Sequence, residues 1–181
     1  NQIIEALFAR NLPVPFLSLL IDDCIANGKD YNSGGARYNT RYYMGVGIGT
    51  LTDSLSAIKY HVFDQKSLTL PELKAALAAN FEGREKLRQL LWNKTPRYGN
   101  DDDRADAIMR QAFEAFYAEV TGRKSVTGAT YRIAMFPTTC HVYFGSVIGA
   151  TPDGRRAGEP LSEGISPVQG ADRRGPTAVL K

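Results

Sequence analysis

The chain has 181 residues, of which 43% are hydrophobic and 23% are charged, a balance that is typical of a folded globular domain and excludes disorder, a collagen-like fibre and a coiled coil. Its 22 lysines and arginines against 19 acidic residues leave a formal charge of +3, and because the basic residues are scattered along the chain, nucleic acid is not an expected partner. No apolar run reaches the roughly 18–20 residues that span a bilayer, and no secretory signal opens the chain, so we expect a cytoplasmic protein without a membrane partner.

The length fits one domain or one large piece of a domain. The sequence begins inside an apolar-periodic stretch and stops directly after residues 177–180, which resemble an unfinished strand. We therefore predict that residues 1–181 are a single piece of one domain, truncated at both ends. Cys24 and Cys140 lack the spacing of a CxxC pair, which argues against a disulfide framework and against a thiolate metal site.

Helices are expected in the first part of the chain. Pro13 and Pro15 interrupt an initial helix, and an apolar stripe that includes Cys24 predicts a second helix ending near Asn27 and Gly28. Glycines and aromatic residues at 31–49 predict short strands and loops instead of a long helix.

Three stronger helical patterns follow. Thr50 or Thr52 can cap a helix whose apolar face carries Leu51, Leu55, Ile58 and Val62. Thr69 and Glu72 have the spacing of a capping box, which predicts a helix from Leu70 with Leu73 and Leu77 inward. Two more helices are expected over residues 84–92 and 100–120, the second ended by Gly122.

The last third is expected to be richer in strands. Alternating residues at 131–135 predict a strand, Pro137 interrupts it, and residues 141–144 predict a second strand after the interruption. A turn at 151–154 then opens a long irregular segment. Helices alternating with short strands make the fold class α/β.

Few residues in the chain suggest chemistry by themselves. Gly45, Gly47 and Gly49 do not match a dinucleotide-binding or P-loop pattern, so close strand–helix packing explains them better than phosphate binding. Only two histidines are present, which excludes a His-rich metal centre in this chain. His61 is expected at the surface, whereas His141 could serve as a base if a carboxylate adjoins it. Consecutive acidic residues at 101–103 are interpreted as structural.

Cys140 and His141 invite the hypothesis of a Cys–His nucleophile. Neighbours on a strand point to opposite faces, so the predicted strand makes Cys140 a packed thiol instead. Thr138 and Thr139 follow Pro137 at the break in the strand, where hydroxyls can face a cavity that holds a polar small molecule. They could equally be turn residues.

Five separated blocks of the sequence resemble the pyruvate formate-lyase-like glycyl radical enzymes. Their order along the chain is that of the family, and together they are more specific than any one of them. The blocks are residues 15–24, 34–39, 52–58, 94–102 and 149–164.

This resemblance implies part of a ten-stranded α/β barrel that encloses a radical site. In such enzymes a backbone glycyl radical passes to a cysteine, and the resulting thiyl radical abstracts hydrogen from the substrate. Neither the glycyl loop nor the cysteine loop of the family is found here, because Cys24 follows Asp23 and Cys140 follows Thr139. The resemblance therefore places both catalytic centres outside this chain, and no catalytic residue is assigned within it.

The segment 135–145 looks most like the dehydratase and lyase branch of the family, which includes trans-4-hydroxyproline dehydratases. The resemblance implies dehydration or C–C, C–O or C–N cleavage of a small polar substrate of the hydroxyproline or glycerol type. It also implies an S-adenosylmethionine iron–sulfur activase as partner, a homodimer, an anaerobic setting, and no bound cofactor or metal beyond the glycyl radical. The expected substrate-binding residues are Met135, Phe136, Thr138 and Thr139.

Three functional hypotheses stay open from the sequence. The chain could be a fragment of a glycyl radical dehydratase or lyase, which would be inactive alone. It could instead belong to a pyruvate formate-lyase-like formate acetyltransferase. The third possibility is a non-catalytic small-molecule-binding module or structural product. A cysteine loop upstream and a glycyl loop downstream in the gene would favour the enzymes.

Overall fold

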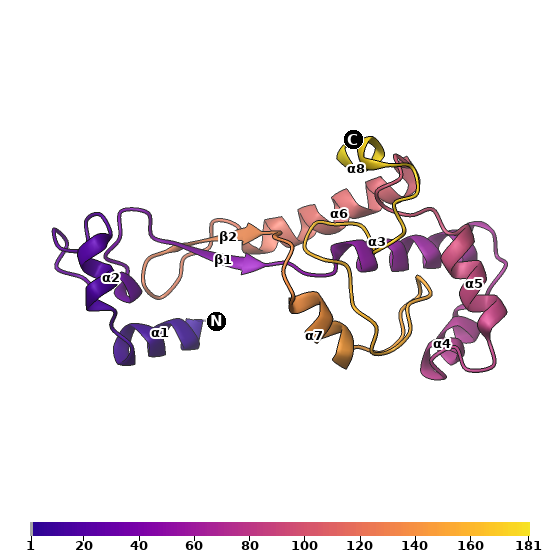
Figure 1. Cartoon of the computed structure of the whole chain (residues 1–181), viewed down its shortest axis with the longest axis horizontal. Coiled ribbons are helices and arrows are strands. Elements are labelled where there is room, and N and C mark those ends of the chain that lie inside the picture. The colour runs from indigo at the N-terminus through magenta and orange to yellow at the C-terminus, as the bar shows by residue number, and fades with distance from the viewer. Residues whose placement is uncertain (1) are drawn as a thin grey trace. The chain divides into compact units, whose positions relative to one another are not determined.

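The computed structural model describes residues 2–181, which form two compact units (Figure 1). The first unit contains the residues up to Tyr43 together with Tyr117–Ala134, and the second contains Met44–Phe116 together with Met135–Lys181. None of the helices in this described part of the chain is both long enough and apolar enough to cross a membrane.

The first unit contains a small parallel sheet. β1 (Thr40–Met44) pairs with β2 (Thr130–Ala134), and the two arrows point the same way in Figure 1. The helices α1 (Gln2–Asn11) and α2 (Pro15–Leu20) precede the sheet, with a 3-10 turn η1 at Tyr31–Ser33. The short strands and loops expected between residues 31 and 49 are confirmed.

The second helix is shorter than the sequence predicts. It ends at Leu20 because Ile21 takes an extended backbone conformation, with φ −102° and ψ 130°. The chain then turns instead of continuing helically to Gly28. Cys24 is buried in this turn, as expected for a packed thiol, although Leu17 and Leu20 on the predicted stripe are exposed.

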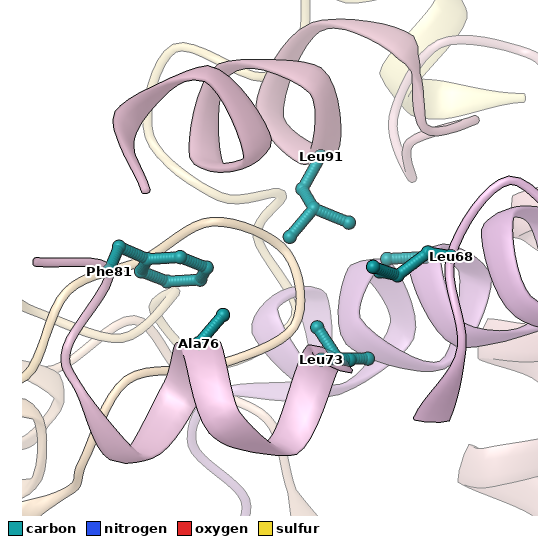
Figure 2. Close-up of a cluster of buried hydrophobic side chains, with 6 residues drawn as sticks. Leu68, Leu73, Ala76, Phe81 and Leu91 are labelled. Atoms are coloured by element: carbon teal, nitrogen blue, oxygen red, sulfur yellow. The ribbon is translucent and has the colours of Figure 1, made fainter. Parts of the chain in front are cut away.

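The second unit is mainly helical and has one compact apolar core. Figure 2 shows buried side chains converging on this core, which consists of Ala57, Leu68, Leu73, Ala76, Phe81 and Leu91. The helices are α3 (Ile48–Ala57), continued by a π-helical segment η2 (Ile58–Asp64), α4 (Leu70–Ala78), α5 (Glu85–Lys94), α6 (Asp103–Val120), α7 (Cys140–Val147) and α8 (Pro176–Leu180).

Local signals predicted several of these boundaries correctly. The Thr69 hydroxyl accepts the Glu72 N–H at 3.3 Å and the Glu72 carboxylate accepts the Thr69 N–H at 2.8 Å, which confirms the capping box. Gly45 and Gly49 lie where a Cβ would collide with Met135 and with the carbonyl of Ser166. The prediction that these glycines serve close packing is therefore confirmed.

The predicted apolar face is correct only in part: Ile58 and Val62, in η2, pack against the core, whereas the inward face of α3 itself does not carry Leu51 and Leu55. The helix begins at Ile48 after Gly47, whose φ of 85° favours glycine, so neither Thr50 nor Thr52 is its cap. Leu51 and Leu55 are 49% and 41% exposed. The buried side of the helix carries mainly polar groups: Thr50, Thr52, Asp53, Ser54, Ser56 and Ala57.

Two predicted strands are helices, and one predicted surface residue is buried. Residues 141–144 belong to α7 and residues 177–180 belong to α8, which has Pro176 in its first turn, where a missing N–H costs nothing. His61 is only 2% exposed, and its Nε2 lies 3.2 Å from the hydroxyl of Thr95. A buried histidine without a charged partner favours the neutral ring, and burial accordingly lowers the pKa of His61.

Removal of Leu91 tests the apolar core. Leu91 is fully buried, so Leu91→Ala should lower the free energy of unfolding by about 2–5 kcal/mol through lost transfer energy and a cavity. Leu90→Ala on the same helix, at 37% exposure, is the matched control and should cost about 0.5 kcal/mol or less. Chemical denaturation measures the free energy of unfolding of both variants. Equal losses in Leu91→Ala and Leu90→Ala would contradict this description of the core.

Candidate functional site

The residues between β2 and α7 form an elbow, defined as Met135–Thr139. The carbonyl of Met135 accepts a hydrogen bond from Ile165 N–H at 3.2 Å. Gly164 passes so close that a Cβ there would collide with the carbonyls of Met135 and Phe136. The elbow is therefore packed directly against the irregular segment that follows α7.

His141 fixes the other end of the elbow. Its Nδ1 lies 2.5 Å from the carbonyl of Thr138, so Nδ1 carries the proton and donates it. Its Nε2 then faces the Glu163 carboxylate at 3.6 Å, and its own carbonyl accepts Leu161 N–H at 3.1 Å. The imidazole thus connects the elbow, the first turn of α7 and the segment around residue 163.

The structure does not support a Cys140–His141 nucleophile. Both residues lie in the first turn of α7 and not on a strand, and Cys140 is exposed, which corrects its prediction as a packed thiol. Both ring nitrogens of His141 face other groups, Thr138 and Glu163. The carboxylate neighbour that the sequence required for His141 is present, in the form of Glu163.

Arg155 holds the C-terminal end of α7. Its buried guanidinium donates to the carbonyls of Ile148 at 3.3 Å, of Glu159 at 2.5 Å and of Gly149. Helix C-termini leave carbonyls without partners inside the helix, and a planar fork of N–H groups can satisfy several of them at once. Gly145 lets residues 159 and 160 approach the helix, because a Cβ there would meet the Glu159 carbonyl.

A buried ion pair joins α3 to the segment after α5. Arg97 donates to the Asp53 carboxylate at 2.8 Å, and Tyr98 N–H donates to the other carboxylate oxygen at 2.9 Å. The same guanidinium donates to the carbonyls of Trp92, at 3.0 Å, and Asp153. Burial raises the pKa of Asp53 to about 7, although Arg97 and the Tyr98 N–H favour the ionised carboxylate.

A reciprocal hydrogen-bonded pair joins α3 to the same irregular segment. The Thr50 N–H donates to the Ser162 hydroxyl at 3.0 Å, and the Ser162 N–H donates to the Thr50 hydroxyl at 2.9 Å. All four groups are buried, so breaking either bond leaves an unsatisfied donor. Residues 151–165 are therefore fixed by α3, by Arg97 and by α7.

The four residues expected to bind substrate are adjacent in the elbow but differ in surroundings. Phe136 is 65% exposed, and Met135 packs at Gly45. The Thr138 hydroxyl accepts Cys140 N–H at 3.4 Å, whereas Thr139 directly precedes α7 without a capping bond from its side chain.

A cavity of about 330 Å³ adjoins the anchors of the elbow. Its polar lining comes mainly from Arg155, His141, Glu159 and Glu163, none of which the sequence singled out as a binding residue. The sequence offers one signal that could have indicated this cavity: Arg155 is a charged residue inside a glycine- and proline-rich segment. Among residues 2–181, His, Cys, Asp and Glu nowhere gather in threes as a metal site.

Comparison with known proteins supports the family resemblance that the five sequence blocks indicate. The family model described as pyruvate formate lyase-like matches residues 1–145. The chain belongs to the pyruvate formate lyase-like family. The resemblance stated from its sequence motifs is therefore confirmed.

Two curated relatives show how much of a longer protein the chain represents. It is 59% identical to trans-4-hydroxy-L-proline dehydratase of Clostridioides difficile over its whole length, which covers 23% of that protein. It is 43% identical to isethionate sulfite-lyase of Nitratidesulfovibrio vulgaris, covering all of this chain and 22% of the lyase. The chain thus spans less than a quarter of the length of these relatives.

Solved structures give the same α/β architecture. Hydroxyproline dehydratase from Clostridioides difficile with trans-4-hydroxy-L-proline bound matches 99% of this chain and 23% of its own, with a TM-score of 0.94 and 59% identity. The glycerol-bound B12-independent glycerol dehydratase from Clostridium butyricum matches 98% of this chain and 22% of its own, with a TM-score of 0.90 and 41% identity.

Substitution of Arg155 tests its role in fixing α7. Lysine keeps the charge but lacks the several N–H donors of the guanidinium. Arg155→Lys should therefore leave buried carbonyls without a donor, and each one should lower the free energy of unfolding by about 1–3 kcal/mol. Amide hydrogen exchange in residues 145–149 should become at least tenfold faster in the full-length protein. Arg156→Lys is the matched control, because the Arg156 side chain is 41% exposed and contacts Glu85 at 2.8 Å. Unchanged exchange in Arg155→Lys would show that other contacts hold this end of α7.

Proposed function

We propose that the full-length protein containing this chain is a glycyl radical dehydratase that acts on trans-4-hydroxy-L-proline or a similar small polar substrate. The observation that carries the proposal is 59% identity to trans-4-hydroxy-L-proline dehydratase over all 181 residues. The match to the hydroxyproline dehydratase structure, with a TM-score of 0.94, supports the same substrate class.

The chain supplies part of the substrate site in this proposal, not the radical carriers. The radical glycine and the catalytic cysteine lie in other parts of the full-length protein, and an S-adenosylmethionine iron–sulfur activase generates the glycyl radical. The thiyl radical on that cysteine abstracts a hydrogen atom from the substrate and becomes a thiol, and the substrate radical then loses one molecule of water. The product radical takes a hydrogen atom back from the thiol, which restores the thiyl radical. The activase and an anaerobic, cytoplasmic setting belong to the proposal.

Met135, Phe136, Thr138 and Thr139 are the proposed pocket residues. Support comes from their place at the break between β2 and α7, where Pro137 ends the strand, and from the exposed ring of Phe136. The elbow is held by Ile165, Gly164 and His141, so its shape is preorganised for a ligand.

We also propose that the full-length protein is a homodimer and that each chain forms a ten-stranded barrel to which both units contribute. The exposed leucines on the outer side of α3, Leu51 and Leu55, are consistent with further barrel elements packing on this helix. A formate acetyltransferase is the weaker alternative, because the similar proteins described above are dehydratases and a lyase.

The decisive assay uses the full-length protein, activated anaerobically by a cognate activase. Electron paramagnetic resonance should show a glycyl radical doublet, and mass spectrometry should show trans-4-hydroxy-L-proline losing one water. Glycerol and isethionate are the comparison substrates, and the 181-residue chain treated in the same way should give no radical signal. An activated enzyme that converts isethionate but not trans-4-hydroxy-L-proline would contradict the proposed substrate.

Threonine-to-valine exchanges test the pocket separately. A lost neutral hydrogen bond of about 1 kcal/mol corresponds to roughly fivefold in binding, so Thr138→Val or Thr139→Val should raise KM about fivefold and leave the radical yield unchanged. Thr177→Val, on α8, is the matched control and should change neither quantity. If both elbow variants keep the KM of the parent enzyme, these hydroxyls do not touch the substrate.

A further inference from the structure

The second unit contains a polar cavity that the proposed chemistry does not use. It has a volume of about 230 Å³ and lies between the end of α5, the residues that follow it, and the segment around residue 173. Five cationic side chains and one carboxylate line it, and we call it the basic cavity. The charged residues are Lys94, Arg97, Arg104, Arg173, Arg174 and Asp102.

Two of these cations are already neutralised. Arg97 is paired with the buried Asp53 at 2.8 Å. Arg104 donates to both oxygens of Asp102, at 2.9 and 2.7 Å. The single carboxylate of the cavity, Asp102, therefore already has an arginine partner. Because its charge is compensated, Asp102 repels a bound anion less than a free carboxylate would.

The other three cations have no carboxylate within salt-bridge distance among the described residues, although the charge of Arg174 helps to lower the pKa of Asp102. Lys94, Arg173 and Arg174 form no salt bridge with any residue that the structure describes. The Arg173 guanidinium donates to the neutral side-chain oxygen of Asn93 at 3.4 Å, and the Arg174 guanidinium donates to the carbonyl of Asn100 at 3.2 Å. All three are exposed, so solvent screens their mutual repulsion, but the cavity keeps an excess of positive charge that a bound anion would neutralise.

Asn100 holds the walls of the cavity in place. Its amide donates to the carbonyl of Ala171 at 2.8 Å and to that of Arg97 at 3.2 Å, and its oxygen accepts Arg173 N–H at 2.8 Å. One half-buried side chain thus ties the segment after α5 to the segment that carries Arg173 and Arg174. The backbone positions of the cations are preorganised, which reduces the entropic cost of binding.

We propose that the basic cavity binds a small anion with two or more negative charges, of the phosphate or pyrophosphate class. The volume lies below the about 300–1,000 Å³ of pockets for drug-sized ligands, so the occupant is small. Arginine forks match phosphoryl oxygens in pairs, and Lys94 adds a point charge. The proposal is independent of the radical chemistry, because no elbow residue lines this cavity.

Titration calorimetry with inorganic pyrophosphate on the full-length protein, at constant ionic strength, tests the proposal. We expect saturable binding of one pyrophosphate per chain. The double variant Arg173→Gln/Arg174→Gln should raise Kd at least tenfold, and Lys94→Gln should raise it severalfold. The matched control is Lys74→Gln/Lys86→Gln, which removes two charges from exposed positions on α4 and α5 and should leave Kd unchanged.

Three results would overturn the proposal. The first is the absence of saturable pyrophosphate binding. The second is an equal Kd for the parent protein and the Arg173→Gln/Arg174→Gln variant. The third is a Kd that the Lys74→Gln/Lys86→Gln control raises as much as the Arg173→Gln/Arg174→Gln variant does, which would show that net charge and not this cavity determines binding. None of these results bears on the dehydratase assay, so failure of the two proposals can be distinguished.

Discussion

The structure of the second unit depends on one buried ion pair, between Asp53 on α3 and Arg97 after α5. Both side chains are almost fully buried, so each charge requires the other, and removing one partner leaves an uncompensated charge inside the protein. Arg97 also donates to the carbonyl of Asp153. The pair thereby orders three segments that are far apart in sequence.

The proposed pocket follows from that constraint. Since Asp53 must reach Arg97, α3 turns its polar side inward, where Thr50 can exchange hydrogen bonds with Ser162. The same segment places Arg155 at one end of α7 and Glu163 at the other. The elbow is thus positioned by buried polar contacts, and the apolar core around Leu91 stabilises the helices behind them.

The sequence predicts the structure correctly where the signal is local. The capping box at Thr69 and the turn closed by Gly154 depend on neighbouring residues, and the structure confirms both. Prediction from the sequence fails where tertiary contacts override propensity. Residues 141–144 look β-rich but form a helix, and Arg155 donates to the carbonyl of Ile148, which directly follows that helix. The sequence also does not reveal the burial of His61, because its contact with Thr95 joins residues that are distant in sequence. The pocket assignment at Met135–Thr139 stays a prediction.

A double-mutant cycle on the ion pair tests the central claim most directly. Asp53→Asn and Arg97→Met should each lower the free energy of unfolding of the full-length protein by about 3–5 kcal/mol, because Asp53→Asn leaves the buried Arg97 charge without its partner and Arg97→Met leaves the buried Asp53 carboxyl without its donor. The double variant should lose less than the sum of the two, with a coupling energy of about 1–3 kcal/mol. Additive losses would mean that the two residues act independently, and would contradict the claim that their pairing organises this end of the molecule.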